Sequence, residues 1–248
     1  MQQLCAHSGG LVRSQRGGRS SSLGTMTGYW SIARADELIA PGTGVPDWLV
    51  LDDGVRARIA GFVNPADSAA AIAARALAAL AVSKLLGMPR EQVALVQTCP
   101  NCGRTDHGRP SVQQHPQAFV SWSRSGEFVA AVAALDPAGI DVERLEATPR
   151  VITGVMADRF SEAEQHWVGA QSNEAEAFVR VWCRKEATVK LGGITLDTMA
   201  EYSCVTGAAL HAASAEEITA DRVVVVQSAS VLERFELKRF LTAVPRRF

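Results

Sequence analysis

The feature of the sequence that most constrains the fold is a long apolar run at residues 68–86, which contains neither Gly nor Pro. Ala, Leu, Ile and Val dominate this run, and a helix that is apolar nearly all round is buried in a core. Gly87 and Pro89 follow the run, which is typical of a helix end. The run therefore predicts a long, largely buried helix.

The second half of the chain repeats this order of elements. A helix is expected at 160–168 and a longer one at 174–191, and Gly192 follows the longer helix. The residues that close the two long helices are similar, SKLLG at 83–87 and VKLGG at 189–193. Strands are expected at 92–97, 118–121, 128–135, 140–143, 223–227 and 235–241. The predicted architecture is α+β, with a flexible leader at 1–28, an N-terminal lobe at 29–138, a C-terminal lobe at 139–248 and a ligand cleft between the lobes.

Composition limits the class of protein. With 47% hydrophobic and 21% charged residues, the 248-residue chain can bury a sizeable core. A net charge of −1 argues against nucleic acid or an anionic membrane as partner. The sequence contains no uninterrupted apolar run of about eighteen residues, so it predicts no membrane span. Residues 1–28 lack the pattern of a secretory signal. Five cysteines are an odd number in a mid-sized chain, so we expect a reduced, cytoplasmic protein.

Two carboxylates alternate along the strand expected at 140–143. Residues two apart in a strand point to the same face, so Asp141 and Glu143 project together while Ile140 and Val142 face the core. Carboxylates side by side repel each other, and a hard divalent cation is the natural occupant between them; Mg²⁺ usually needs only one or two carboxylates together with substrate phosphates. Taken alone, the same alternation also suits an exposed strand edge.

A second group of charged residues lies on the helix expected at 174–191. Trp182, Glu186 and Lys190 stand four apart and form one stripe, which Lys185 flanks. Taken alone, this group is better explained as a surface ion pair. If the strand and the helix face each other, however, three acids and two lysines converge. Such a group suits displacement at phosphorus, in which a metal and amines neutralise charge and a carboxylate accepts a proton.

These segments resemble the two signature motifs of the surfactin-type 4′-phosphopantetheinyl transferases. GIDVE at 139–143 is similar to G-[IV]-D-[IVL]-E, and WCRKEATVK at 182–190 is similar to W-[STC]-x-K-E-[AS]-x-x-K. Upstream, HGRP at 107–110 resembles the family's G-K-P stretch, and SRSG at 123–126 resembles its S-H-S-G stretch. The helix at 75–84 resembles the basic-flanked helix of the family's first lobe.

The resemblance implies two α+β lobes related by a pseudo-twofold axis in one monomeric chain, with coenzyme A between them. It implies that Asp141, Glu143 and Glu186 bind Mg²⁺ together with the coenzyme A diphosphate. Glu186 would activate a serine of the carrier protein, Lys190 would stabilise the departing 3′,5′-ADP, and Asp141 completes the catalytic group. The residues implied to contact coenzyme A are Arg75, Arg109, Pro110, Ser123, Arg124, Lys185 and Lys190.

The chain departs from the family pattern at one position. Arg124 stands where the family usually has His near the 3′-phosphate. Because Arg can make the same contact with a permanent charge, we expect coenzyme A binding to be retained. The alternative is that Trp122 and Arg124 mark a reshaped nucleotide pocket.

Cys99-Pro-Asn-Cys102, with His107 nearby, has the spacing of half a structural zinc site. No second CxxC or close HxxxH completes the site, and Cys183 and Cys204 lie in other elements. We therefore expect a loop at 98–110 that leads into the HGRP stretch and carries incidental thiols.

The function expected from the sequence is transfer of the phosphopantetheine arm of coenzyme A to a serine of an apo acyl, aryl or peptidyl carrier protein. The alternative is a non-catalytic protein of the same fold that binds coenzyme A or a carrier. The presence of all three acids and of Lys190 favours the transferase. The sequence leaves fatty-acid, polyketide and nonribosomal-peptide carriers open, and it lacks GxSxG, Walker and GxGxxG patterns.

Overall fold

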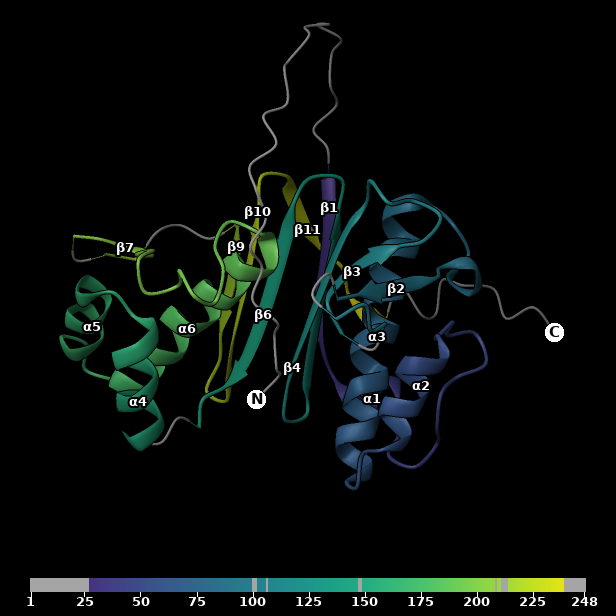
Figure 1. The fold of residues 1–248 in the computed structure, drawn as a ribbon, viewed down its shortest axis with the longest axis horizontal. Helices are drawn as coiled ribbons and strands as arrows, with labels where there is room; N and C mark the ends of the chain where they lie inside the picture. Colours follow the sequence, from purple (N-terminus) through teal and green to yellow (C-terminus); the bar gives the residue numbers. More distant parts are fainter. Residues whose placement is uncertain are drawn as a thin grey trace, which may run out of the picture.

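The structure is a computed structural model that describes residues 27–99, 102–105, 107–146, 149–207, 209–210 and 214–238. It contains helices and two main sheets, which confirms the predicted α+β class (Figure 1). The helices are α1 (Ala35–Leu38), α2 (Asp53–Ala60), α3 (Pro65–Leu86), α4 (Pro149–Arg159), α5 (Glu162–Gly169) and α6 (Glu174–Leu191), with a 3₁₀ turn at Arg90–Gln92. The strands are β1 (Thr27–Arg34), β2 (Leu95–Thr98), β3 (Arg109–Val112), β4 (Phe119–Ser125), β5 (Phe128–Ala134), β6 (Ala138–Arg144), β7 (Val205–Thr206), β8 (Ala209–Leu210), β9 (Ala215–Ile218), β10 (Arg222–Ser228) and β11 (Val231–Arg234).

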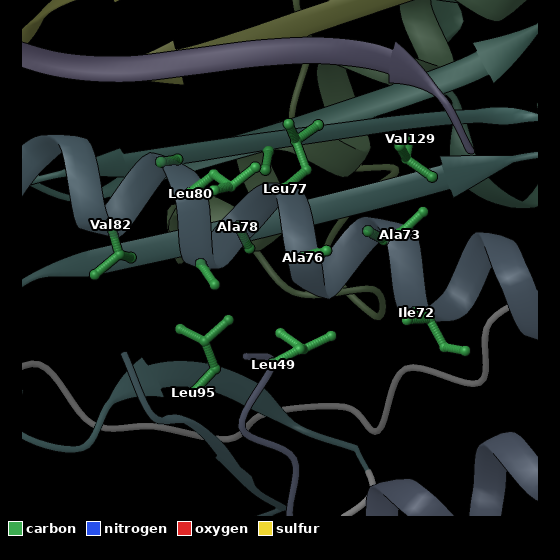
Figure 2. Close-up of a cluster of buried hydrophobic side chains, with 14 of the residues drawn as sticks. Leu49, Ile72, Ala73, Ala76, Leu77, Ala78, Leu80, Val82, Leu95 and Val129 are labelled. Carbon is green, nitrogen blue, oxygen red and sulfur yellow. The ribbon is translucent and has the colours of Figure 1, made fainter. Parts of the chain in front are cut away.

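Helix α3 is the core helix predicted from the apolar run. Asn64 caps its N-terminus through a side-chain bond to the Ala66 N–H, and Pro65 occupies the first turn, where it lacks a donor that would be unpaired anyway. Gly87 ends the helix in the left-handed conformation, with φ of 63°. Figure 2 shows the helix between strands of the sheet on one side and Leu49 and Leu95 on the other.

By length and composition alone, α3 could cross a membrane. However, 78% of its most apolar window is buried inside the protein. The helix packs on β5, β4 and β1, so its apolar surface is covered by its own domain. This burial explains the composition of the run without a membrane.

The two sheets lie face to face between the two long helices. The larger sheet has the strand order β11-β1-β5-β4-β3-β2 and the smaller one β6-β10-β9. Helix α3 covers the outer face of the larger sheet, and α6 packs on β6 and β10 of the smaller sheet. A third apolar cluster fills the space between the sheets, with Trp30, Phe128 and Val132 from the larger sheet and Ile140, Val142, Val224 and Val226 from the smaller one. The layers are therefore helix, sheet, sheet and helix.

The prediction of a strand at 235–241 is wrong for residues 235–238, which are the part of this range that the structure describes. The last strand is β11, at Val231–Arg234, and residues 237 and 238 are helical. Strand β11 pairs in parallel with β1, so the end of the described chain returns to the larger sheet. A parallel partner more than two hundred positions away leaves little local signal, which is why the sequence misplaced this strand. Residues 1–26 of the predicted leader at 1–28 lie outside the described residues. Its last two residues belong to β1, which begins at Thr27.

Candidate active site

Strand β6 and helix α6 are held in unusually close contact by Gly139. A Cβ atom at this glycine would lie 2.0 Å from the carbonyl oxygen of Ala187 and 2.6 Å from the amide nitrogen of Leu191. Only a residue without a side chain allows the strand backbone to approach the helix backbone this closely. The next residues on the same face, Asp141 and Glu143, therefore lie directly against α6.

Asp141 is the centre of the polar group between β6 and α6. Its Oδ1 accepts hydrogen bonds from Ser123 Oγ on β4, at 2.7 Å, and from Lys190 Nζ on α6, at 2.6 Å. Lys190 also donates to Ser123 Oγ at 3.1 Å. The side chain of Asp141 is 3% exposed, and its Oδ2 is buried with no hydrogen-bond partner. A buried, unpaired carboxylate oxygen is costly unless a ligand satisfies it.

Glu143 on β6 and Glu186 on α6 both feel the charge of Asp141. Glu143 accepts a hydrogen bond of 2.6 Å from Ser125 Oγ. Burial and then the charge of Asp141 raise the pKa of Glu143 from 4.5 to about 7, against the opposing effects of Ser125 and Lys190. Burial and the charge of Asp141 likewise raise the pKa of Glu186 from 4.5 to about 7. The raised pKa values of Glu143 and Glu186 mean that ionising either carboxyl beside Asp141 is unfavourable without a further cation.

Lys190 remains protonated in this group. Burial disfavours its charged amine, but the carboxylates of Asp141 and Glu186 outweigh burial and raise the pKa of Lys190 above its ordinary 10.5. The predicted convergence of Asp141, Glu143, Glu186 and Lys190 is what the structure shows.

Three serines of β4 join the two sheets beside this group. Strand β6 is the edge of the smaller sheet, and its Ile140 and Arg144 N–H groups donate to Ser121 Oγ and Ser125 Oγ at 3.4 Å and 3.2 Å. The serines alternate along β4, so all three point to the face that β6 covers. Sequence reasoning chose Ser123 and missed Ser125, although the alternation of serines was a signal that could have identified it.

Lys185 does not join the acidic group. Its Nζ donates to Glu164 Oε2 of α5 and to the carbonyl oxygen of Tyr202, both at 2.6 Å, and both ionic side chains are 0% exposed. A helix turns about 100° per residue, and this turn takes Lys185 from the stripe of Glu186 onto the face covered by α5. The expectation that Lys185 converges with the three acids and Lys190 is therefore not what the structure shows.

The other residues expected to contact coenzyme A are divided between two places. Arg75 lies over the Trp122 ring, with 5.4 Å from Cζ to the ring centroid, and donates to Gln97 Oε1 at 3.1 Å. Arg124 lies over the Phe62 ring at 5.3 Å, and burial lowers the pKa of its guanidinium. Trp122 and Arg124 alternate with the serines of β4, so they face α3 rather than β6. The structure does not bring Arg75 and Arg124 to the acidic group.

Arg109 and Pro110 begin β3, at the end of the loop expected at 98–110. The Arg109 side chain lies over the Phe119 ring at 5.5 Å and donates to the Leu191 carbonyl at 3.3 Å. It thereby reaches the C-terminus of α6, next to Lys190. Pro110 pairs with Gln97 across the hairpin. Arg109 is the arginine of the expected set that lies near the acidic group.

The chemistry of the acidic group fits Mg²⁺ in part. Carboxylate oxygens are hard ligands, and the buried Asp141 Oδ2 has no protein partner. Within the described ranges, Asp141, Glu143 and Glu186 do not form a group whose ligand atoms all lie within 4.8 Å of one another. Mg²⁺ usually takes one or two carboxylates together with substrate phosphates and water. The donor set therefore suits a cation that is shared with a phosphate ligand.

Part of the chain matches a known protein family. Residues 137–228 match the model of the 4′-phosphopantetheinyl transferase superfamily. The matched segment runs through β6, α6 and β10 and contains Asp141, Glu143, Glu186 and Lys190. No curated protein matches the chain. The match covers less than half of the chain and shows that this segment is similar to the superfamily, whereas transferase activity and the surfactin-type subfamily stay predictions.

Proposed function

We propose that this protein transfers the 4′-phosphopantetheine group of coenzyme A to a serine of an apo carrier protein and releases 3′,5′-ADP. The observation that carries the proposal is the convergence of Asp141, Glu143, Glu186 and Lys190 between β6 and α6. These four residues lie in the segment that matches the transferase superfamily. The surfactin-type motifs around them support that subfamily.

In the proposed reaction, the carrier serine oxygen forms a bond to the phosphorus atom that bears the pantetheine arm. The bond from this phosphorus to the oxygen of 3′,5′-ADP breaks, and the proton of the serine hydroxyl passes to Glu186. A general base works best when its pKa lies near the working pH. The pKa of about 7 that burial and Asp141 give to Glu186 supports this role.

Lys190 would hold the leaving diphosphate. Its amine is kept protonated by Asp141 and Glu186, and a fixed positive charge stabilises the negative charge that develops on a leaving phosphate. Asp141 and Ser123 hold the amine in place through hydrogen bonds of 2.6 Å and 3.1 Å. Arg109, at the end of α6, is the second cation close enough to serve the phosphates.

Mg²⁺, when bound, would neutralise the diphosphate charge. Asp141 Oδ2, Glu143 and Glu186 are the residues that would hold it. Lys185 is left out of the proposed phosphate site because its amine is buried in the pair with Glu164. We further propose that the protein acts as a monomer in the cytoplasm on acyl, aryl or peptidyl carrier domains.

The experiment that tests the proposal is a transfer assay read by intact mass. Apo carriers of the fatty-acid, polyketide and nonribosomal-peptide types are incubated with coenzyme A, Mg²⁺ and the protein. At least one carrier should gain the mass of a phosphopantetheine group. Glu186→Gln should abolish the gain, whereas Glu174→Gln, an exposed change on the same helix, should not.

Binding of coenzyme A supplies the second readout. Calorimetric titration of the wild-type protein that shows coenzyme A binding, combined with no mass gain on any carrier, would favour the non-catalytic alternative. Full transfer activity in Glu186→Gln would refute the role given to that carboxylate while leaving the transferase assignment in place.

A further inference from the structure

A second group of metal-binding side chains lies outside the acidic site, in the loop between β2 and β3. The ligand atoms of Cys99, Cys102 and His107 all lie within 4.8 Å of one another. Cys102 Sγ is 3.3 Å from His107 Nε2. Both cysteines are thiols rather than partners in a disulfide. The sequence predicted incidental thiols here, so their convergence with the histidine is new information from the fold.

The loop backbone is shaped so that the two cysteines face one point. The Cys99 N–H donates to the Arg104 carbonyl at 2.9 Å, and the Gly103 N–H donates to the Cys99 carbonyl at 2.8 Å. Gly103 adopts φ of 69°, a conformation that favours glycine. This turn brings the chain back to Cys99 directly after Cys102, consistent with the short separation of their ligand atoms.

Gly108 brings the histidine to the same point. Its φ is 107°, and a Cβ atom there would lie 2.7 Å from the backbone carbon and oxygen of Thr98. The Gly108 carbonyl also accepts a hydrogen bond of 2.8 Å from Gln97 Nε2. The returning strand therefore lies against Thr98, and His107 is placed beside Cys99 at the base of the loop.

The distances suit a single tetrahedral ion. With Zn–S bonds of about 2.3 Å and Zn–N bonds of about 2.0 Å, a sulfur and a nitrogen on one zinc lie about 3.5 Å apart. The separation of 3.3 Å between Cys102 Sγ and His107 Nε2 is close to this value. Two thiolates and one imidazole are borderline-soft donors that favour zinc over Mg²⁺ or Ca²⁺.

We propose that Cys99, Cys102 and His107 bind one zinc ion that closes the loop between β2 and β3. Cys99 is fully buried and Cys102 is exposed, so the ion would sit at the boundary between the core and the solvent. Binding would release the thiol protons, because the thiolate is the ligand. The site is separate from the acidic group and does not depend on the proposed function.

The ion would also position Arg109. Thr98 and Arg109 form the last pair of the hairpin, so the metal ligands lie immediately beyond that pair. Arg109 extends from there to the Leu191 carbonyl at the end of α6. A zinc ion at the base of the loop would limit the motion of the strand end that carries this arginine.

The test is the metal content of the full chain, produced with zinc in the medium and purified in a metal-free, reducing buffer. Inductively coupled plasma mass spectrometry should find one zinc ion per chain. Cys102→Ser and His107→Ala should each reduce zinc to background. Cys204→Ala and His115→Ala, which change the same residue types elsewhere in the fold, should keep it.

Replacement of zinc by Co²⁺ in the wild-type protein provides a second readout, which does not depend on whether the substituted variants fold. Thiolate-to-cobalt charge transfer in the near ultraviolet and strong visible bands of a tetrahedral ion are the expected result. Hydrogen exchange of the Cys99 and Gly103 amides should accelerate when a chelator removes the ion. Wild-type protein that holds no zinc and gives no cobalt spectrum would overturn the proposal. Zinc retained in both ligand variants, or a Cys99–Cys102 disulfide in protein isolated without reductant, would overturn it as well.

Discussion

Replacement of Glu186 by Gln should stabilise the protein at alkaline pH while it removes activity. The Glu186 side chain is on the inner face of α6, and the residue is 7% exposed. Burial and the charge of Asp141 raise its pKa from 4.5 to about 7, although Lys190 and Arg159 partly oppose them. Gln has nearly the shape of protonated Glu and carries no charge. The substitution therefore removes the free energy that the folded protein spends on ionising this carboxyl.

The magnitude follows from the pKa shift. The shift from 4.5 to about 7 corresponds to about 3 kcal/mol, since each pKa unit is worth about 1.4 kcal/mol. The folded state binds this proton more tightly than the unfolded state does, so the stability of the wild type falls as pH rises from about 4.5 through about 7. Glu186→Gln and wild type should thus be equally stable near pH 4, and the variant should be more stable by up to about 3 kcal/mol near pH 8.

The assay is urea unfolding at a series of pH values, in the presence of a chelator so that no divalent cation pairs with the carboxylates. The free energy of unfolding is compared between wild type, Glu186→Gln and the exposed control Glu174→Gln. Mg²⁺ added at the alkaline end should raise the stability of the wild type more than that of Glu186→Gln. If the variant is less stable near pH 8, or if its difference from the wild type does not change with pH, the account of the acidic group is wrong.

Two further substitutions test the packing around the site. Lys185→Met should lower the free energy of unfolding by about 3–5 kcal/mol, because it leaves Glu164 buried without its partner. The double variant Lys185→Met/Glu164→Gln should recover much of that loss, because Gln removes the unpaired charge and keeps an oxygen for the Cys204 N–H. A single variant as stable as wild type in urea would contradict the structural role. Gly139→Ala should lower stability by about 1–3 kcal/mol, since the new methyl group would collide with the Ala187 carbonyl. An unchanged melting temperature of Gly139→Ala in calorimetry would show that β6 and α6 are not in the contact described here.

Local sequence signals predicted the long helices and the centre of the site. The helix expected at 174–191 has those bounds in the structure, because Asn173 caps one end and Gly192 adopts φ of 91° at the other. Alternation along β6 correctly placed Asp141 and Glu143 on one face. In each of these cases the signal lies within a few residues of the feature that it predicts.

The features that sequence reasoning missed depend on contacts between distant segments. From the sequence, Lys185 was expected to flank the stripe of Glu186 and Lys190, and only the packing of α5 shows that it pairs with Glu164 instead. The approach of His107 to Cys99 depends on the backbone conformations of two glycines, Gly103 and Gly108, which both have positive φ. The sequence does not show that these conformations together bring the two side chains close. The place of β11 depends on the assembled larger sheet.

The central claim is that the four residues between β6 and α6 transfer phosphopantetheine, and intact-mass measurement of apo carriers tests it most directly. With coenzyme A and Mg²⁺, the wild-type protein should add one phosphopantetheine group to at least one carrier of the panel. Omission of Mg²⁺, or the change Glu186→Gln, should prevent the addition. No gain of mass on any carrier, from wild-type protein shown by calorimetry to bind coenzyme A, would contradict the claim.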